Sequence, residues 1–226
     1  METVLITGAN RGIGLALAKA GQASGRRVIA TCRNPEGAGD LQALAGPDFA
    51  VERLDIADSA SIRALADRLA DQTIDILFQN AGVYGGERQS RTNMDSQAWL
   101  ETLRVSVIAP FEVATAFEPH LKRSARGRLV ALSSQMGSIA GASTGAYAYR
   151  SAKAALNRVM RLMALELAGS VIVVPVHPGW VRTDMGGTGA DLAPEQSAAG
   201  LLALADRLTP ADSGRFWNWD GRELPW

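Results

Sequence analysis

Tyr149 and Lys153 are the residues of this sequence whose types and spacing best suit chemistry. They lie four positions apart in a segment of helical periodicity, so their side chains share one helix face. A tyrosine hydroxyl normally has a pKa of about 10, too high for ready proton exchange at neutral pH. An ammonium group about 4 Å away contributes roughly 4 kcal/mol at an effective dielectric constant of about 20, or about three pKa units. We therefore predict that Tyr149 is an acid and base whose pKa Lys153 lowers. Tyr147 has Ser151 four residues on and lacks the cation.

A pair of serines, Ser133 and Ser134, follows an apolar run upstream of this segment. Side chains alternate along a strand, so we expect Ser133 to point away from the side that Ser134 faces. A hydroxyl group at Ser134 can hold a substrate oxygen and stabilise its developing charge. Ser134 is therefore the third predicted catalytic residue.

A glycine-rich turn, residues 7–14, links the first expected strand to the first expected helix. Gly8 permits a tight turn, Gly12 lets the main chain approach a pyrophosphate, and Gly14 lets the helix pack on the sheet. Free N–H groups and the positive end of the helix dipole then favour phosphate groups. The context of strand, turn and helix predicts a dinucleotide site.

The end of the second expected strand indicates which dinucleotide binds. An NAD enzyme places a carboxylate there for the ribose 2′-hydroxyl, but this sequence has Arg33. Arg11 in the glycine turn is a second cation near the same place. Two guanidinium groups and no carboxylate predict NADP(H) as the cofactor.

Apolar runs alternate with amphipathic stretches along the whole chain. Expected strands cover Thr3–Thr7, Arg27–Cys32, Ala50–Leu54, Ile74–Gln79, Arg128–Ser133, Val171–His177 and a short last strand near Gly214–Asn218; expected helices include Ile13–Ala23, Ser59–Ala70, Trp99–Ser124 and Ala148–Ala168. This alternation predicts an α/β fold with a doubly wound, mostly parallel, seven-stranded sheet and helices on both faces. No linker interrupts it, so residues 1–226 are expected to form a single domain.

Composition limits the partners. The 23 positive and 23 negative side chains balance, so neither nucleic acid nor a membrane surface is expected to bind, and no apolar run reaches the length of a membrane span. Cys32 is the single cysteine, and no signal peptide is evident, which favours a reducing, cytoplasmic setting. No metal site is predicted.

The order of these motifs resembles the classical short-chain dehydrogenases/reductases over essentially the whole chain. The resemblance rests on the glycine turn, Asn80-Ala81-Gly82, Ser134, Tyr149-Arg150-Ser151-Ala152-Lys153 and the segment Pro178–Thr183. The segment Tyr147–Asn157 and the ending Asp220–Trp226 look most like the C-factor-like branch, which includes carbonyl-reductase-like members and an intercellular signalling protein. The resemblance implies an oxidoreductase that transfers a hydride between NADP(H) and a small carbonyl or alcohol.

The resemblance also implies roles for individual residues. Asp55 lies beside the adenine, Lys153 binds the nicotinamide ribose, and Thr183 binds the carboxamide together with the main chain at Val181. The full set of implied cofactor contacts is Gly8, Asn10, Arg11, Gly12, Ile13, Gly14, Arg33, Asp55, Ile56, Asn80, Ala81, Gly82, Tyr149, Lys153, Pro178, Gly179, Val181 and Thr183.

The chain departs from the family pattern at two positions. Ser106 stands where the family usually has an asparagine that binds a water connecting the lysine to solvent. A serine can hold a water in a different geometry, so Ser106 is a catalytic candidate and leaves the efficiency of the proton relay open. Gln79 replaces the first asparagine of the usual Asn-Asn-Ala-Gly, and little effect is expected because Asn80 is retained.

A mostly apolar group is expected near the nicotinamide, which favours an uncharged carbonyl substrate. Its members are Val83, Tyr84, Met136, Tyr147, Trp180 and Met185, and core packing is the alternative role for each. The glycine-rich loop at residues 184–195 is short for a lid, so we expect an open site.

Other readings remain open. Gly141–Gly145 fits the nucleophile elbow of a serine hydrolase with Ser143 as nucleophile, but the motif requires a preceding strand. A dinucleotide-binding signalling or regulatory protein with little turnover is the main alternative. The two long helices, Trp99–Ser124 and Ala148–Ala168, suit a homodimer or homotetramer, and the sequence leaves a monomer open.

Overall fold

Seven strands form one sheet in the computed structural model, which describes residues 1–226. The order across the sheet is β3-β2-β1-β4-β7-β8-β9, and every neighbouring pair is parallel. The strands are β1 Thr3–Ile6, β2 Arg27–Cys32, β3 Phe49–Arg53, β4 Ile76–Gln79, β7 Gly127–Leu132, β8 Val171–His177 and β9 Trp217–Asn218. The prediction of a seven-stranded Rossmann-like α/β domain is confirmed, with a sheet that is parallel throughout.

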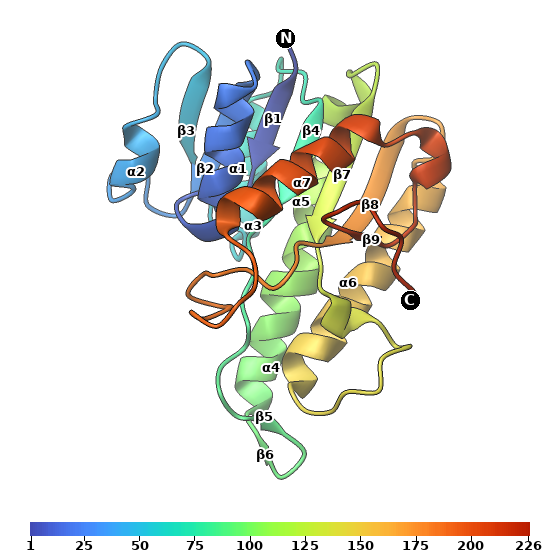
Figure 1. The fold of residues 1–226 in the computed structure, drawn as a ribbon. Coiled ribbons are helices and arrows are strands. Elements are labelled where there is room, and N and C mark those ends of the chain that lie inside the picture. Colours follow the sequence, from blue (N-terminus) through green and yellow to red (C-terminus); the bar gives the residue numbers. More distant parts are fainter.

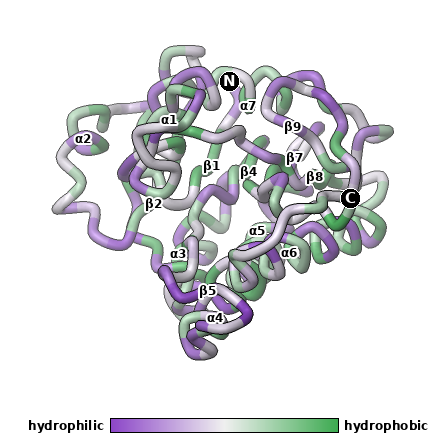
Figure 2. Tube along the Cα trace, turned by 60° about the horizontal axis from the view of Figure 1, so that its bottom comes forward, coloured by the Kyte–Doolittle hydropathy of each residue, from purple (hydrophilic) through white to green (hydrophobic).

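Helices cover both faces of this sheet (Figure 1). They are α1 Gly12–Ala23, α2 Gly39–Gln42, α3 Ser59–Arg68, α4 Ser96–Leu103, α5 Ala109–Lys122, α6 Tyr147–Glu166 and α7 Pro194–Arg207, with short 3₁₀ turns at Gln135–Gly137 and Pro210–Asp212. Figure 2 shows the strands between α1 and α7 on one side and α3, α5 and α6 on the other. None of the helices combines the length and the apolar character that crossing a membrane requires.

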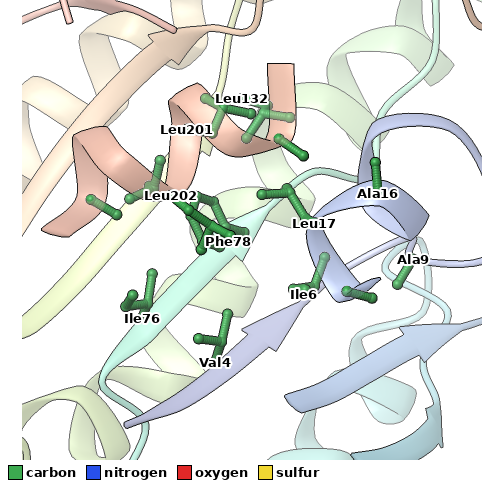
Figure 3. Close-up of a cluster of buried hydrophobic side chains, with 14 of the residues drawn as sticks. Val4, Ile6, Ala9, Ala16, Leu17, Ile76, Phe78, Leu132, Leu201 and Leu202 are labelled. Carbon is green, nitrogen blue, oxygen red and sulfur yellow. The ribbon is translucent and has the colours of Figure 1, made fainter. Parts of the chain in front are cut away.

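Alternation along the strands divides the core into two layers. Val4 and Ile6 of β1 pack with Leu17 of α1 and Leu201 of α7 on one face, while Leu5 packs into the cluster on the other face. Figure 3 shows the first of these clusters around the central strands. Both faces are apolar because helices shield the sheet from water on both sides.

The predicted helix Trp99–Ser124 has an interruption that periodicity did not reveal. A π-helical turn at Arg104–Ile108 separates α4 from α5. Pro110 has no N–H, so the carbonyl oxygen of Ser106 cannot accept the ordinary hydrogen bond from four residues ahead. The wider turn at Ser106 follows from that missing donor, and such turns are frequent at functional sites.

The predicted elements did not include the short helix α2, helix α7 or a small hairpin. Helix α7 begins at Pro194 directly after the irregular loop, and its residues Leu201 and Leu204 are buried in the core. A small antiparallel hairpin joins β5 Gln89–Ser90 to β6 Asn93–Met94. Strands of two residues are too short for alternation to reveal them.

Candidate active site

The predicted catalytic residues gather at the carboxyl edge of the sheet, where ligands bind in folds of this type. Ser134 follows β7, and Tyr149 and Lys153 lie in the first two turns of α6. The Ser134 side chain lies close enough to Tyr149 to favour the ionised form of the phenol. Ser134 Oγ also accepts a hydrogen bond from the Met136 N–H at 3.1 Å, which fixes the serine at the start of a 3₁₀ turn.

The neighbouring Ser133 faces another direction, as the alternation along β7 predicts. Its Oγ donates a hydrogen bond to Asn157 Oδ1 at 2.6 Å within the packing between β7 and α6. Ser133 is therefore committed to holding the helix, while Ser134 faces Tyr149.

Lys153 is buried beside Tyr149. Its Nζ donates a hydrogen bond to the carbonyl oxygen of Leu132 at 2.8 Å and lies 5.8 Å from the centroid of the Tyr149 ring. Burial lowers the pKa of Lys153 from 10.5 to about 8, because the charged form loses its hydration.

The predicted direction of the Tyr149 pKa is wrong for this structure. Burial raises the pKa of Tyr149, and the nearby Ser134 side chain only partly opposes that effect. The expectation from spacing gave a size for the effect of the Lys153 charge and set no size for the opposing loss of water around the phenol, which disfavours its ionised form and is the larger effect here. Tyr149 is therefore held as a proton donor at neutral pH.

Ser106 lies in the π-helical turn with a buried hydroxyl that has no hydrogen-bond partner. A Cβ atom added to Gly82 would lie 3.7 Å from Lys153 Nζ and 3.9 Å from Ser106 Oγ. The lysine and the serine thus border the same small space at Gly82. An orphaned buried hydroxyl is rare and indicates a site where water or a ligand group binds. Gln79, the other departure, donates from Nε2 to the Pro110 carbonyl oxygen at 2.7 Å.

The glycine turn has the conformation that its sequence predicts. Gly8 and Gly12 have φ values of +67° and +55°, and a side chain on Gly14 would overlap with the carbonyl oxygen of Gly8. Asn80 Nδ2 supports the turn by donating to the carbonyl oxygens of Thr7 and Gly8, each at 2.9 Å. No side chain caps the start of α1, so its first N–H groups are available to a phosphate.

Residues far apart in sequence meet at this turn. A Cβ atom on Gly12 would lie 3.1 Å from Thr183 Cγ2, and Val181 is buried beside Thr183. Arg11 forms an ion pair with Asp184 between two largely exposed side chains. The turn and the segment after β8 therefore lie against each other.

The two predicted phosphate-binding arginines differ in the structure. Arg11 is engaged by Asp184, which the sequence argument did not consider, so it is not a free cation. Arg33 is exposed at the end of β2 and forms no ion pair.

The other predicted cofactor residues lie near the same sheet edge. Asp55 and Ile56 follow the neighbouring β3, and the Asp55 N–H donates to Ser61 Oγ at 3.0 Å. Asn10 is exposed in the turn, Ile13 lies in the first turn of α1, and Ala81 donates its N–H to Thr7 Oγ1.

The predicted substrate-pocket residues are mostly not core residues. Tyr84, Tyr147, Trp180 and Met185 are between 42% and 54% exposed, whereas Val83 and Met136 are partly buried. The rings of Tyr84 and Tyr149 lie 4.9 Å apart at an angle of 36°. Trp180 Nε1 donates to the carbonyl oxygen of Gly186 at 2.9 Å, which ties the ring to the loop after β8.

A cavity of about 390 Å³ beside Gly179 was not predicted. Its lining comprises Gln135, His177, Gly179, Trp180, Asp191, Leu192, Asn218, Trp219, Asp220, Arg222 and Leu224. Burial lowers the pKa of His177 to about 4, with the charge of Asp220 opposing the shift, so this imidazole is neutral. The lining comes from four separate segments, so no local spacing in the sequence identifies it.

The structure confirms the expectation that argues against a serine hydrolase, namely that Ser143 lies in a loop. Ser143 lies in an exposed, irregular loop between the 3₁₀ turn and α6, with no strand leading into it. A nucleophile elbow requires a strand directly before the serine and a helix directly after it.

Comparisons with known proteins agree with this geometry. A family model described as short chain dehydrogenase matches residues 2–191. The chain is 39% identical over 167 residues to the C-signal protein of Myxococcus xanthus, covering 73% of this chain and 100% of that protein. The carbonyl reductase Sniffer of D. melanogaster superimposes with a TM-score of 0.94 at 33% identity, covering 100% of both chains. A carbonyl reductase from Pseudomonas aeruginosa PAO1, in complex with NADP, gives a TM-score of 0.90 at 37% identity and the same coverage. With its glycine turn, and with Ser134 and the buried Lys153 beside Tyr149 at one sheet edge, the chain belongs to the short chain dehydrogenase family.

Proposed function

We propose that the chain is an NADP(H)-dependent oxidoreductase that transfers a hydride between nicotinamide and a small, apolar carbonyl or alcohol. The observation that carries this proposal is that Ser134 and the buried Lys153 both lie beside Tyr149 at one edge of the sheet. The family match and the similarity to a carbonyl reductase in complex with NADP support the same activity.

The chain offers a binding residue for each part of the cofactor. The main chain of Gly8 to Ile13 would hold the pyrophosphate at the uncapped start of α1. Arg33 at the end of β2 would bind the 2′-phosphate. Thr183 and the main chain at Val181 would hold the carboxamide, and Lys153 would hold the nicotinamide ribose. When bound, NADP(H) would supply or accept the hydride.

The protein itself donates one proton to the substrate oxygen and stabilises the negative charge that develops on that oxygen. As a carbonyl oxygen becomes an alkoxide, Ser134 donates a hydrogen bond to it and Tyr149 donates its hydroxyl proton. The raised pKa of Tyr149 keeps this proton in place at neutral pH. The ammonium group of Lys153 stabilises the resulting phenolate, and a water held by Ser106 returns a proton from solvent.

The exposed apolar side chains and the cysteine content bear on the oligomeric state and on the cellular compartment of the protein. The exposed side chains Leu100, Ile108 and Phe111 lie on α4, the π turn and α5, and Leu165 lies on α6. These apolar side chains favour a homodimer or homotetramer formed through the long helices. A single buried cysteine favours the reducing cytoplasm.

A cofactor and substrate panel tests this function. NADPH and NADH oxidation are measured with aromatic ketones, quinones, aldehydes and keto acids, and dissociation constants of both cofactors are measured by fluorescence. Turnover with NADPH and uncharged carbonyls, in preference to keto acids, is the expected result. Tight binding of NADPH with no turnover across the panel would instead identify a dinucleotide-binding signalling protein.

A further inference from the structure

We propose that Gln89 is a positioning residue for the reaction. Its side-chain amide joins the loop that carries Tyr84 and Gly86, called the Tyr84 loop below, to the first turn of α6, and it thereby fixes the position of Tyr149. The inference rests on the proposed function, because its consequence is the alignment of Tyr149 with Ser134. Gln89 belongs to the hairpin that the sequence did not predict and does not itself touch the reacting atoms.

Every hydrogen-bonding group of this side chain amide has a partner. Gln89 Oε1 accepts a hydrogen bond from the Tyr149 main-chain N–H at 2.9 Å. Gln89 Nε2 donates to the carbonyl oxygens of Tyr84 and Gly86, at 2.9 and 2.8 Å. The reverse orientation of the amide would set NH₂ against an N–H and oxygen against two carbonyl oxygens, so the contacts fix a single orientation. Only 5% of Gln89 is exposed.

The start of α6 needs an acceptor from outside the helix. The residue at its N-cap is Ala146, which has no side-chain oxygen and lies in the left-handed region with φ +49°. The N–H of Tyr149, the third residue of the helix, is one of the donors that an N-cap side chain normally satisfies. Gln89 supplies the missing acceptor from 60 residues away.

The same amide places the Tyr84 ring against Tyr149. The carbonyl oxygen of Tyr84 is held by Gln89 Nε2, and the two tyrosine rings lie 4.9 Å apart. The segment that carries Tyr84 continues directly from Asn80–Gly82, which supports the glycine turn. The Gln89 side chain thus connects the segment that runs from Asn80–Gly82 to Tyr84 with helix α6, which carries Tyr149.

The hairpin that carries Gln89 is itself anchored. Asp95 caps α4 by accepting hydrogen bonds from the N–H groups of Gln97 and Ala98, each at 3.1 Å, and pairs with Arg88 next to Gln89. Gly85 has a φ of +95°, and a Cβ atom at this position would overlap with the Thr102 side chain of α4. The loop before the hairpin therefore packs closely on that helix. These contacts hold Gln89 against α6 from a separate element, which a positioning role requires.

Two variants distinguish positioning from simple stability. Gln89→Met keeps the length and approximate volume but removes all three hydrogen bonds. Gln89→Glu keeps an acceptor for Tyr149, loses both donations to the Tyr84 loop, and adds a negative charge. The groups that face the Tyr149 side chain are Ser134 after β7, Tyr84 after β4 and Lys153 on α6. Gln22→Met is the matched control, because it deletes one amide hydrogen bond, to the Leu44 carbonyl oxygen at 3.0 Å, far along the chain from these groups.

The experiment measures kcat, KM and pH–rate profiles for the full chain, with the dissociation constant of NADPH and the melting temperature of each variant. For Gln89→Met we expect a loss of about 10- to 100-fold in kcat, as displacement of a reacting group by about 1 Å produces. We expect the dissociation constant of NADPH to change less than about twofold. For Gln89→Glu, the fall in reduction rate at high pH should move to higher pH, because a carboxylate near Tyr149 opposes formation of the phenolate.

A second readout does not depend on turnover. Ultraviolet difference titration, with Tyr149→Phe in each background to isolate the signal of Tyr149, should show a higher Tyr149 pKa in Gln89→Glu than in the unmodified protein. A loss of melting temperature equal to that of Gln22→Met, with unchanged kcat and unchanged Tyr149 titration, would overturn the proposal. If the unmodified protein reduces no carbonyl, the proposed function fails, whereas the titration still decides whether Gln89 acts on Tyr149.

Discussion

Gly137 lies directly against the main chain of Lys153: a Cβ atom added to Gly137 would come within 2.7 Å of the Lys153 carbonyl carbon. It would also lie 2.9 Å from the main-chain nitrogen of Ala154. The 3₁₀ turn that begins at Ser134 and the helix that carries Lys153 can therefore approach each other only because residue 137 has no side chain.

Gly137→Ala should separate these two elements. Overpacking of this kind costs about 1–3 kcal/mol of unfolding free energy, and the displaced helix should lower kcat as well. Urea unfolding and NADPH-dependent turnover measure the two effects. Gly141→Ala is the control, because the nearest atom to a Cβ atom there is 3.8 Å away. Equal behaviour of the two variants would contradict the close packing.

Ser106→Ala tests the proton relay. The hydroxyl of Ser106 has no protein partner, so its removal should change the unfolding free energy by less than about 0.5 kcal/mol. If it holds the water that resupplies protons, kcat should fall about three- to tenfold, a fraction of what general acid–base catalysis contributes. Ser170→Ala, which removes a hydroxyl bonded to the Leu167 carbonyl oxygen at 2.9 Å, should leave kcat unchanged. An unaltered kcat in Ser106→Ala would remove the serine from the relay.

The buried Lys153 should make stability depend on pH in a defined window. Its pKa is about 8 in the folded protein and about 10.4 in an unfolded chain, so between these values the unfolded state binds more protons. Stability therefore rises with pH in this window, and below it the buried charge costs up to about 3 kcal/mol. Lys153→Met should be the more stable protein at pH 7, with the difference shrinking by pH 10.

Urea unfolding from pH 7 to pH 10 measures this effect. Lys122→Met serves as the control because Lys122 is an exposed partner of Glu118. A constant difference between Lys153→Met and the unmodified protein at all pH values would show that Lys153 does not lose its proton in this range.

Cofactor preference should depend on Arg33. Replacement by aspartate repels the 2′-phosphate of NADP(H) and offers an acceptor to the 2′-hydroxyl of NAD(H). The ratio of kcat/KM for NADPH to that for NADH should fall at least about tenfold in Arg33→Asp, which corresponds to about 1.4 kcal/mol. Arg63→Asp, an exposed arginine on α3, makes the same change of charge away from the site. If both variants keep the original kcat/KM ratio of NADPH to NADH, Arg33 does not bind the 2′-phosphate.

Short-range spacing predicted the features that lie within one turn or helix. Gly8 to Gly14 span a single strand–helix junction, and Tyr149 and Lys153 share one helix face, so their sequence separation fixes their arrangement. Strands β1, β2, β4, β7 and β8 were predicted to within a few residues at each end because both of their faces are apolar. Pro110 explains the π turn at Ser106, but the periodicity of the sequence did not predict that turn.

Features that depend on long-range contacts or on burial could not be predicted from the sequence. Gln89 meets Tyr149 from a separate hairpin, and Asp184 meets Arg11 from the segment after β8. The Tyr149 pKa was predicted in the wrong direction because its sign depends on how much water the fold excludes, which spacing does not contain. The cavity at Gly179 likewise combines segments from Gln135 to Leu224.

The central claim is that Tyr149 donates the proton in an NADPH-dependent reduction. The most direct test compares the unmodified protein with Tyr149→Phe, measuring NADPH oxidation with the best carbonyl of the panel and NADPH binding by fluorescence. We predict a loss of at least about 100-fold in kcat with a dissociation constant for NADPH within about threefold of the original. A Tyr149→Phe variant that reduces the same carbonyl at the original rate would contradict the account.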